Sequence, residues 1–301
     1  MVGRAASKRA PSRGGPYAGQ ILGGLRRAGL SYWVGGVALL VILIVIAGAL
    51  LAPWIAPYPD QGAGSSNLVA ALAQPGPAHW FGTDEEGRDL VSRVLFGARV
   101  SLGVSFVVVV VAIVIGVALG ATAGYVGGLA ETVLMRATDF FLAFPSLLLA
   151  LAIAAIIGPS LKNMIIALMV SWWPWYARLV HDQASVLRNA AFVRSARVTG
   201  VRTGTILWRH IIPNTLTPVL VQGTSDIGSA IISAAALSFL GLGVQPPTAD
   251  WGSMVSTGRE YILAQWWYAT FPGAAIFVTA MAFNLLGDTL RDATDATARR
   301  S

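Results

Sequence analysis

Six long apolar stretches restrict the possible folds of this chain more than any other feature. A helix needs about 20 apolar residues to cross the hydrocarbon core of a bilayer, because each residue advances it by only ~1.5 Å. Over the whole chain, 55% of the residues are hydrophobic and 12% are charged, which is too apolar for an ordinary soluble domain. We therefore predict an all-α integral membrane protein with six transmembrane helices. The stretches are residues 33–52, 102–123, 133–157, 164–180, 216–240 and 269–290.

The Lys and Arg residues predict which side of the membrane each connection faces. Short loops rich in these residues are retained in the cytoplasm during insertion. Six spans place both termini on one side, with the second connection and the segment between the fourth and fifth spans. That side holds 16 of the 21 Lys and Arg residues, so both termini are expected in the cytoplasm. The other side holds Arg88, Arg93, Arg99, Lys162 and Arg259.

These spans define one transmembrane domain over residues 33–295. A basic cytoplasmic tail, residues 1–32, precedes it, and a short cytoplasmic tail, residues 296–301, follows it. Two long polar segments, residues 53–98 and 241–268, are expected as loops on the outer side.

The first span follows residues 22–30, which are predicted to form a surface helix. At about 20 residues, the first apolar stretch is too long for the core of a signal peptide. We therefore expect it to remain in the protein as a membrane span rather than to be cleaved as a secretion signal.

Small residues and prolines predict how the spans pack and bend. Gly116, Gly120 and Gly124 recur at every fourth position of the second span, a spacing that lets a neighbouring helix approach closely. Pro145 predicts a kink in the third span, and Pro174 predicts an interruption of the fourth.

A basic segment separates the fourth and fifth spans. Residues 187–214 contain five arginines and no acidic residue, and long apolar stretches flank them. A short helix over Phe192–Val201 is expected to present Phe192, Ala196 and Val198 to a partner, with Ala196 and Gly200 small enough for close approach. A cytoplasmic loop of this size points to a soluble partner or a regulatory role.

Several sequence patterns resemble one family. The frame Arg194-Ser195-Ala196, Gly200 and Ile212-Pro213 resembles the cytoplasmic coupling loop of ABC importer permeases, which starts with Glu-Ala-Ala and has Gly and Pro at these spacings. Arg194 and Ser195 depart from that pattern. Three further segments resemble the second, C-type permease of dipeptide and oligopeptide importers: His79–Leu102, Ala236–Met254 and Phe271–Asp295.

The resemblance implies the type I ABC importer permease fold in the cell membrane, with a sister permease subunit. Two cytoplasmic ATPase subunits or domains would bind the coupling loop, and an extracytoplasmic substrate-binding protein would deliver a peptide. The chain itself would need no cofactor, metal or catalytic residue and would bind no nucleic acid, because ATP and Mg would belong to the ATPase partners. The implied ATPase-coupling residues are Phe192, Arg194, Ser195, Ala196, Arg197, Val198, Gly200 and Pro213.

One acidic residue inside a span marks a candidate translocation path. Asp226 lies ten residues after Leu216, about 15 Å into the fifth span. An acidic side chain at that depth rarely faces lipid and usually faces a water path or a partner. It could attract the amino terminus of a peptide, or it could form a structural hydrogen bond or an ion pair with the sister subunit. The candidate path residues are Gln222, Thr224, Ser225, Asp226 and Asn284.

Other polar and aromatic residues have simpler interpretations. The acidic run around Asp84 and Asp89, with His79 nearby, could suggest a divalent-metal site, but it lacks the calcium-loop spacing. Packing of the outer loop with Arg88 and Arg93, or docking of a binding protein, fits better. Asp139 is expected to pair with Arg136, and membrane-interface positions are expected for Trp251, Trp266 and Trp267.

Other transport classes explain the sequence less well. The same architecture could import another small solute, such as a nickel complex. An ion-coupled secondary carrier would show inverted repeats and intramembrane ion ligands, and a channel would show a repeated selectivity segment. An intramembrane enzyme is a poor fit, because His181 and His210 lie away from the serines of the spans and the chain has no cysteine.

Overall fold

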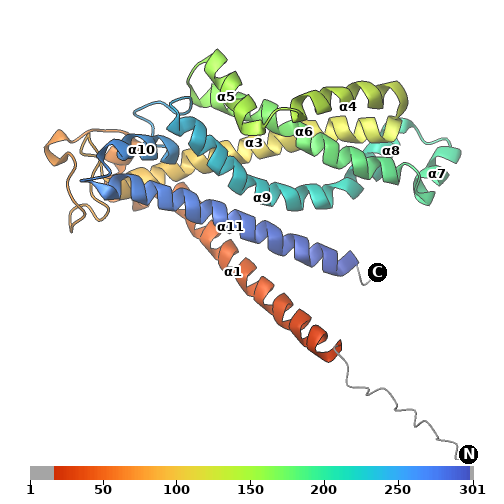
Figure 1. Cartoon of the computed structure of the whole chain (residues 1–301), viewed down its shortest axis with the longest axis horizontal. Helices are drawn as coiled ribbons and strands as arrows, with labels where there is room; N and C mark the ends of the chain where they lie inside the picture. Colours follow the sequence, from red (N-terminus) through yellow and green to blue (C-terminus); the bar gives the residue numbers. More distant parts are fainter. Residues whose placement is uncertain (1–16, 299–301) are drawn as a thin grey trace, which may run out of the picture.

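The computed structural model describes residues 17–298, and its elements there are all helices (Figure 1). Four segments are long and apolar enough to cross a membrane, and a fifth qualifies if the bent pair α4 and α5 forms one span. Helix α6 is 27 residues long but is not among them, because aromatic, proline and charged residues interrupt its apolar character. The four segments are Trp33–Ile55 in α1, Leu90–Val126 in α3, Thr203–Phe239 ending in α9, and Trp266–Thr294 in α11.

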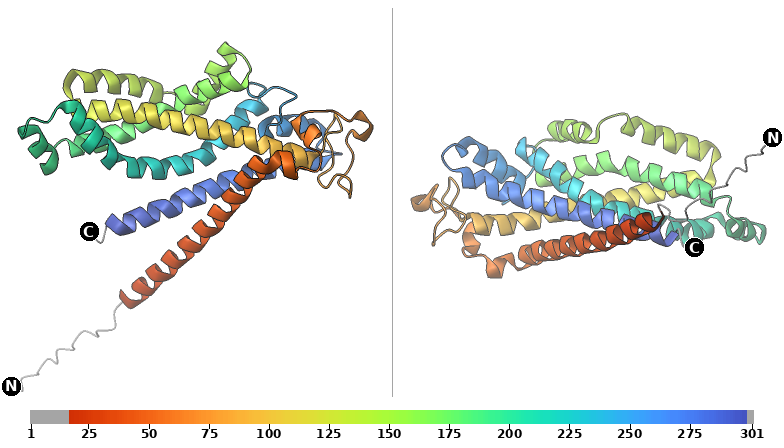
Figure 2. Two further views of the ribbon diagram at one scale, coloured as in Figure 1. Left: turned by 180° about the vertical axis from the view of Figure 1, so that it is seen from behind. Right: turned by 60° about the horizontal axis from the view of Figure 1, so that its bottom comes forward.

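The two ends of the bundle are built from different segments. One end carries residues 59–89 and α10, and the opposite end carries α7 and α8 (Figure 1). The predicted outer segments thus lie together, away from the basic segment. Helix α1 diverges from α11 toward its N-terminal end. The N-terminal part of α1 therefore stands apart from the bundle (Figure 2). The helices are α1 Tyr17–Ile55, α2 Pro59–Ala63, η1 Leu68–Ala70, α3 Leu90–Val126, α4 Gly128–Leu142, α5 Ser146–Ile157, α6 Leu161–Leu187, α7 Ala191–Val198, α8 Thr203–Ile206, η2 Leu207–Ile211, α9 Ile212–Phe239, α10 Trp251–Gly258, η3 Arg259–Tyr261 and α11 Trp266–Ala298.

The helix boundaries at α1 and α3 differ from the sequence-based expectations. Residues 22–30 do not form a separate helix, because α1 runs without a break from Tyr17 to Ile55. Helix α3 begins at Leu90, where the Asp89 carboxylate accepts a hydrogen bond from the Ser92 amide, so the predicted outer loop ends earlier than residue 98.

The two prolines act differently from the prediction. Pro145 does more than kink a helix: α4 ends at Leu142, α5 begins at Ser146, and their axes differ by 85°. A proline lacks an amide donor and disfavours helix at the residue before it, which accounts for this break. Pro174 does not interrupt α6, which continues through it and buries it among neighbouring helices.

The glycine stripe of α3 packs against α6, as its spacing predicts. A Cβ atom at Gly120 would overlap the carbonyl oxygen of Ala177, and one at Gly124 would lie 2.5 Å from that of His181. Gly116 similarly faces Tyr176. The backbones of α3 and α6 therefore approach closely along about two turns, and this contact fixes the position of the segment that leads to α7.

Replacement of Gly120 by Ala is expected to lower the free energy of unfolding by about 1–3 kcal/mol, because a side chain there would force α3 and α6 apart. The matched control is Gly103→Ala in the same helix, where a new Cβ meets no atom within 4 Å. The control should be neutral or slightly stabilising, because Ala favours helix over Gly by about 1 kcal/mol. Thermal unfolding in detergent measures both, and equal melting temperatures would contradict the close α3–α6 contact.

The acidic run at the end formed by residues 59–89 and α10 is part of a packed ion network. The Arg88 Nε atom lies 2.6 Å from Asp84 Oδ2, and His79 Nδ1 lies 3.0 Å from Asp89 Oδ1. Burial opposes the charge of Arg88, but the carboxylates of Asp84, Glu86 and Glu85 outweigh this effect and raise its pKa. The predicted packing role of Asp84, Asp89 and Arg88 is confirmed by these contacts.

Two of the tryptophans expected at the membrane interface lie in the protein core instead. Trp251 is 1% exposed and its indole nitrogen donates to the Val94 carbonyl over 2.9 Å, and Trp267 is 3% exposed. The interface prediction is therefore wrong for these two. Both residues join the outer segments to α3 and α11, whereas Trp266 is exposed.

Candidate functional site

A cavity of about 450 Å³ lies where the break between α4 and α5 meets the middle of α6 and α9. Aromatic and apolar side chains come from the break and from α6, while polar groups come mainly from α9. Its walls therefore combine large apolar surfaces with a few hydrogen-bonding groups, which is typical of a small-molecule site. The lining residues are Phe141, Leu142, Phe144, Ser146, Ser171, Trp172, Trp175, Gln222, Asp226 and Ser229.

Asp226 is the acidic group of this cavity and anchors a chain of hydrogen bonds across three helices. Its carboxylate accepts from the Tyr176 hydroxyl over 2.5 Å and from Gln222 Nε2 over 2.9 Å. The Gln222 side-chain oxygen in turn accepts from Arg291 Nη2 over 2.8 Å. Within a bilayer these groups have little water to replace such partners, so the chain of bonds holds the carboxylate in a defined position.

The other predicted path residues lie elsewhere. The Thr224 hydroxyl donates to the Leu220 carbonyl of its own helix. Ser225 packs against Gly287, and Asn284 lies beside Gly228, so both are at the contact of α9 with α11. Of the five candidates, only Gln222 and Asp226 line the cavity.

The sequence reasoning missed the contribution of α6 to this cavity. Ser171, Trp172 and Trp175 line it from α6, and Ser229 lines it from α9 one turn beyond Asp226. The run Trp172-Trp173-Pro174-Trp175 was the available signal, because three tryptophans beside a proline are unusual in the middle of an apolar stretch.

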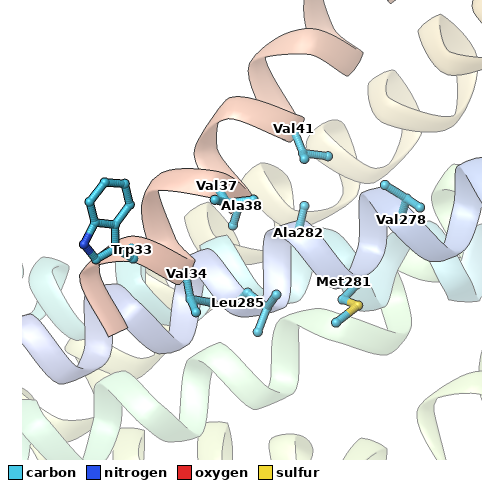
Figure 3. Close-up of a pocket in the computed structure, with 9 residues that line it drawn as sticks. All are labelled: Trp33, Val34, Val37, Ala38, Val41, Val278, Met281, Ala282 and Leu285. Carbon is cyan, nitrogen blue, oxygen red and sulfur yellow. The ribbon is translucent and has the colours of Figure 1, made fainter. Parts of the chain in front are cut away.

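A second hollow has a different chemistry. It lies between α1 and α11, has a volume of about 350 Å³, and is lined by nine apolar or aromatic residues that include Trp33, Val37 and Met281 (Figure 3). None of the nine carries a charge. This groove suits acyl chains or another apolar helix surface, whereas the Asp226 cavity can recognise a cationic or hydrogen-bonding solute.

The basic segment folds into a short helix with a specific end. The amide of Val201 donates to the Ala196 carbonyl, and the amide of Gly200 donates to the Arg197 carbonyl. Gly200 has a φ of +78°, a conformation that glycine adopts without strain. These features form a Schellman motif, which accounts physically for the glycine at position 200.

Helix α7 exposes some of the predicted coupling residues and buries another surface. Val198 is 88% exposed, Phe192 is 45% exposed, and Val193 is fully buried in the core of the bundle. The residues Arg194, Ser195 and Arg197 are also exposed, as are Gly200 and, in the first turn of α9, Pro213.

The expectation that Ala196 faces a partner needs correction. Ala196 is half-buried and packs with Val193 against the protein's own core. The helix also ends at Val198, before the predicted Val201, because the Schellman motif terminates it. The surface that α7 offers to a partner is therefore built around Phe192 and Val198.

Ion pairs at this end of the bundle join α4 to α6. Asp139 pairs with Arg178, so the expected pairing of Asp139 with Arg136 is wrong. His181 contacts Glu131 through Nε2 at 2.9 Å and Asp182 through Nδ1 at 3.0 Å. His181, one of the two histidines considered for an enzymatic role, therefore contacts two carboxylates.

Comparison with known proteins identifies the family. Residues 112–300 match the family described as binding-protein-dependent transport system inner membrane component. The probable D,D-dipeptide transport system permease protein DdpC of Escherichia coli (strain K12) is 46% identical over 255 residues, 85% of each chain. The dipeptide transport system permease protein DppC of Alkalihalophilus pseudofirmus is 43% identical over 259 residues, 86% of this chain and 84% of the relative. The chain therefore belongs to this family of inner-membrane permease components.

Two further similarities agree with this family. The glutathione transport system permease protein GsiD of Escherichia coli O6:K15:H31 is 46% identical over 259 residues, 86% of this chain and 84% of the relative. A chain of the MetNI methionine ABC transporter, in inward-facing conformations, has a similar fold with a TM-score of 0.52 at 19% identity. That similarity covers 66% of this chain and 95% of the other, and it concerns the fold alone.

Proposed function

We propose that this chain is a transmembrane permease subunit of an ATP-driven importer for dipeptides or oligopeptides. The observation that carries the proposal is the cavity at Asp226, a fixed carboxylate among aromatic side chains within the bundle. Support also comes from the family membership and from relatives named as dipeptide and glutathione permeases.

The cavity chemistry suits a peptide. The Asp226 carboxylate complements an ammonium group, such as the amino terminus of a peptide. Trp172 and Trp175 offer aromatic faces to a cation or to side chains, and Ser171 and Ser229 offer hydroxyl groups for hydrogen bonds. A selectivity based on so few groups is broad, so the binding protein would set most of the substrate preference.

The proposed subunit works in a larger assembly in the cell membrane. A sister permease would complete the cavity, whose wall leaves Phe144 and Trp175 about half exposed. Two ATPase subunits, which carry ATP and Mg, would bind α7, and a substrate-binding protein would dock at the end formed by residues 59–89 and α10. In this arrangement α6 and the bent pair α4–α5 complete six spans, and both termini lie in the cytoplasm.

Transport in this proposal alternates between two openings of the cavity. Closure of the ATPases would move α7, and the helices joined to it would change which side of the membrane the Asp226 cavity faces. The chain performs no covalent chemistry in this scheme. Its own residues hold the substrate, fix the position of the carboxylate and transmit movement.

Import of a solute other than a peptide is the principal alternative function. A carboxylate at the same position would also attract a cationic or metal-containing solute, such as a nickel complex, carried by the same architecture. Competition distinguishes the two: unlabelled dipeptides should inhibit uptake of a labelled dipeptide, while nickel complexes should not.

Reconstitution of the chain with its sister permease, ATPases and binding protein is expected to give peptide uptake that requires ATP. Tags at both termini and within residues 187–214 should report a cytoplasmic location, and tags near Ser65 and Asp250 an external one. A control complex with an ATPase that cannot hydrolyse ATP should take up no peptide. An external report from residues 187–214, or uptake independent of ATP, would overturn the proposal.

A further inference from the structure

The turn between α3 and α4, residues 125–131, is contacted by three side chains from the segment that ends in α7. His181 on α6 contacts Glu131 at the start of α4 over 2.9 Å. The Arg197 guanidinium on α7 lies 5.4 Å from the centroid of the Tyr125 ring at the end of α3. Between them, Arg188 lies beside Gly127.

Tyr125 and His181 are the most buried side chains of these contacts, whereas Arg197 is exposed on α7. Tyr125 is 4% exposed, and the His181 side chain is 12% exposed. Gly127 has a φ of +73°, and a Cβ atom there would overlap the Arg188 guanidinium. Glycine therefore serves two purposes at this position, because it permits both the backbone turn and the approach of the arginine.

The turn leads directly to the wall of the substrate cavity. Helix α4 starts at Gly128 and ends at Leu142, and its C-terminal residues Phe141 and Leu142 line the cavity together with Phe144. A 15-residue helix is ~22 Å long, so α4 can carry a displacement from the turn to the cavity as a stiff rod.

We propose that Arg197, Arg188 and His181 form a clasp on the turn, through which movement of α7 is transmitted to α4 and thus to the cavity wall. In this inference, which rests on the proposed function, Tyr125 and Arg197 are positioning residues. Arg197 therefore acts within its own subunit, through the Tyr125 ring, rather than chiefly as a contact to the ATPase.

The test uses the complete transporter and a double-mutant cycle. Arg197→Gln and Tyr125→Leu should each lower peptide uptake about fivefold, the loss that corresponds to a partly desolvated cation–π contact. Uptake by the double variant should be no lower than uptake by the more impaired of the two single variants, because both changes remove the same contact. Arg197→Lys and Tyr125→Phe keep the cation and the ring and should retain uptake, and Arg136→Gln controls for loss of an exposed arginine on α4.

The cysteine variant Phe144→Cys allows the movement of the cavity wall to be measured by thiol reactivity. A purely structural role of the clasp residues would not alter the effect of ATP on this reactivity. In the otherwise unchanged complex, the rate of its reaction with a small polar thiol reagent should change when ATP traps the transporter. In the Arg197→Gln and His181→Gln variants, ATP hydrolysis and subunit association should continue while this ATP-dependent change is lost. If Tyr125→Leu does not assemble, the His181→Gln variant still provides this measurement.

Two outcomes would contradict the clasp. Additive losses in the double variant would mean that Arg197 and Tyr125 act separately, with Arg197 contacting the ATPase. An unaltered ATP-dependent change at position 144 in the clasp variants would mean that α4 does not carry the movement. A complex that takes up no peptide but shows the expected change at position 144 would disprove the proposed substrate and leave the clasp supported.

Discussion

Asp226→Leu is expected to reduce peptide uptake at least tenfold while the chain still inserts and assembles. The change removes the charge that attracts an ammonium group, and it leaves the Tyr176 hydroxyl and Gln222 Nε2 without their acceptor. Each unsatisfied polar group costs about 1–3 kcal/mol, so some loss of stability should accompany the loss of uptake. Asp226→Asn keeps an acceptor oxygen and should lose uptake with less destabilisation.

Initial rates of uptake by the reconstituted complex measure this prediction, with co-purification of the other subunits as the measure of assembly. Ser233→Ala is the matched control, since Ser233 lies on the same helix and its hydroxyl donates only to the Ser229 carbonyl. It should leave uptake unchanged. Full uptake by the Asp226→Leu variant would show that the carboxylate takes no part in the path.

The double change Phe192→Asp and Val198→Asp is expected to abolish association with the ATPases. Both side chains are exposed on α7, whose other face is fixed to the core by Val193. Apolar side chains exposed on a connecting segment mark an interaction surface, and an aromatic anchor at such a surface is typically worth about 2 kcal/mol or more. Two carboxylates at these positions would be desolvated by a partner, and a loss of about 2 kcal/mol already weakens binding about thirtyfold.

Co-purification of the ATPases through a tag on this chain measures the effect. Val186→Asp is the control, because Val186 is 74% exposed on α6 and lies outside α7. The bulky double change at Ala196 and Gly200 is a poorer test, since Ala196 packs inside the protein and Gly200 needs a positive φ. ATPases that co-purify in normal amount with the Phe192 and Val198 double variant would remove α7 as the coupling surface.

The sequence was most informative where one local property decides the structure. Gly116, Gly120 and Gly124 predicted close packing by a neighbouring helix, and the structure shows that this helix is α6. The basic segment predicted a short helix that contains Ala196, and the Schellman motif at Gly200 ends this helix at Val198, before the predicted Val201. Family patterns gave the importer class without any knowledge of contacts.

Tertiary packing decided the features that the sequence did not predict. Trp251 and Trp267 have side chains that suit a membrane interface, yet the outer segments fold over them and bury them. Asp139 has Arg136 as a sequence neighbour but pairs with Arg178, which α6 brings beside α4. These outcomes depend on which helices meet, and that is not encoded in a local pattern.

The residues of the candidate translocation path also depend on how the helices pack, which the sequence does not show. Asp226 was identified from its charge and depth, and Gln222, Thr224 and Ser225 were identified as its polar neighbours in the sequence. Ser225 and Asn284 looked equally polar in sequence, but their directions around the helices place them at the α9–α11 contact. Trp172 and Trp175 line the cavity because α4 and α5 bend by 85° at Pro145 and leave space beside them.

The reactivity of cysteines in the cavity of the assembled transporter tests the central claim most directly. The chain has no native cysteine, so Asp226→Cys and Ser229→Cys each introduce a single thiol on this subunit. In a complex whose other subunits lack cysteine, both should react with a small polar thiol reagent, and the rates should change when ATP traps the complex. No reaction at either position in any nucleotide state would contradict the claim that this cavity lines an ATP-driven path.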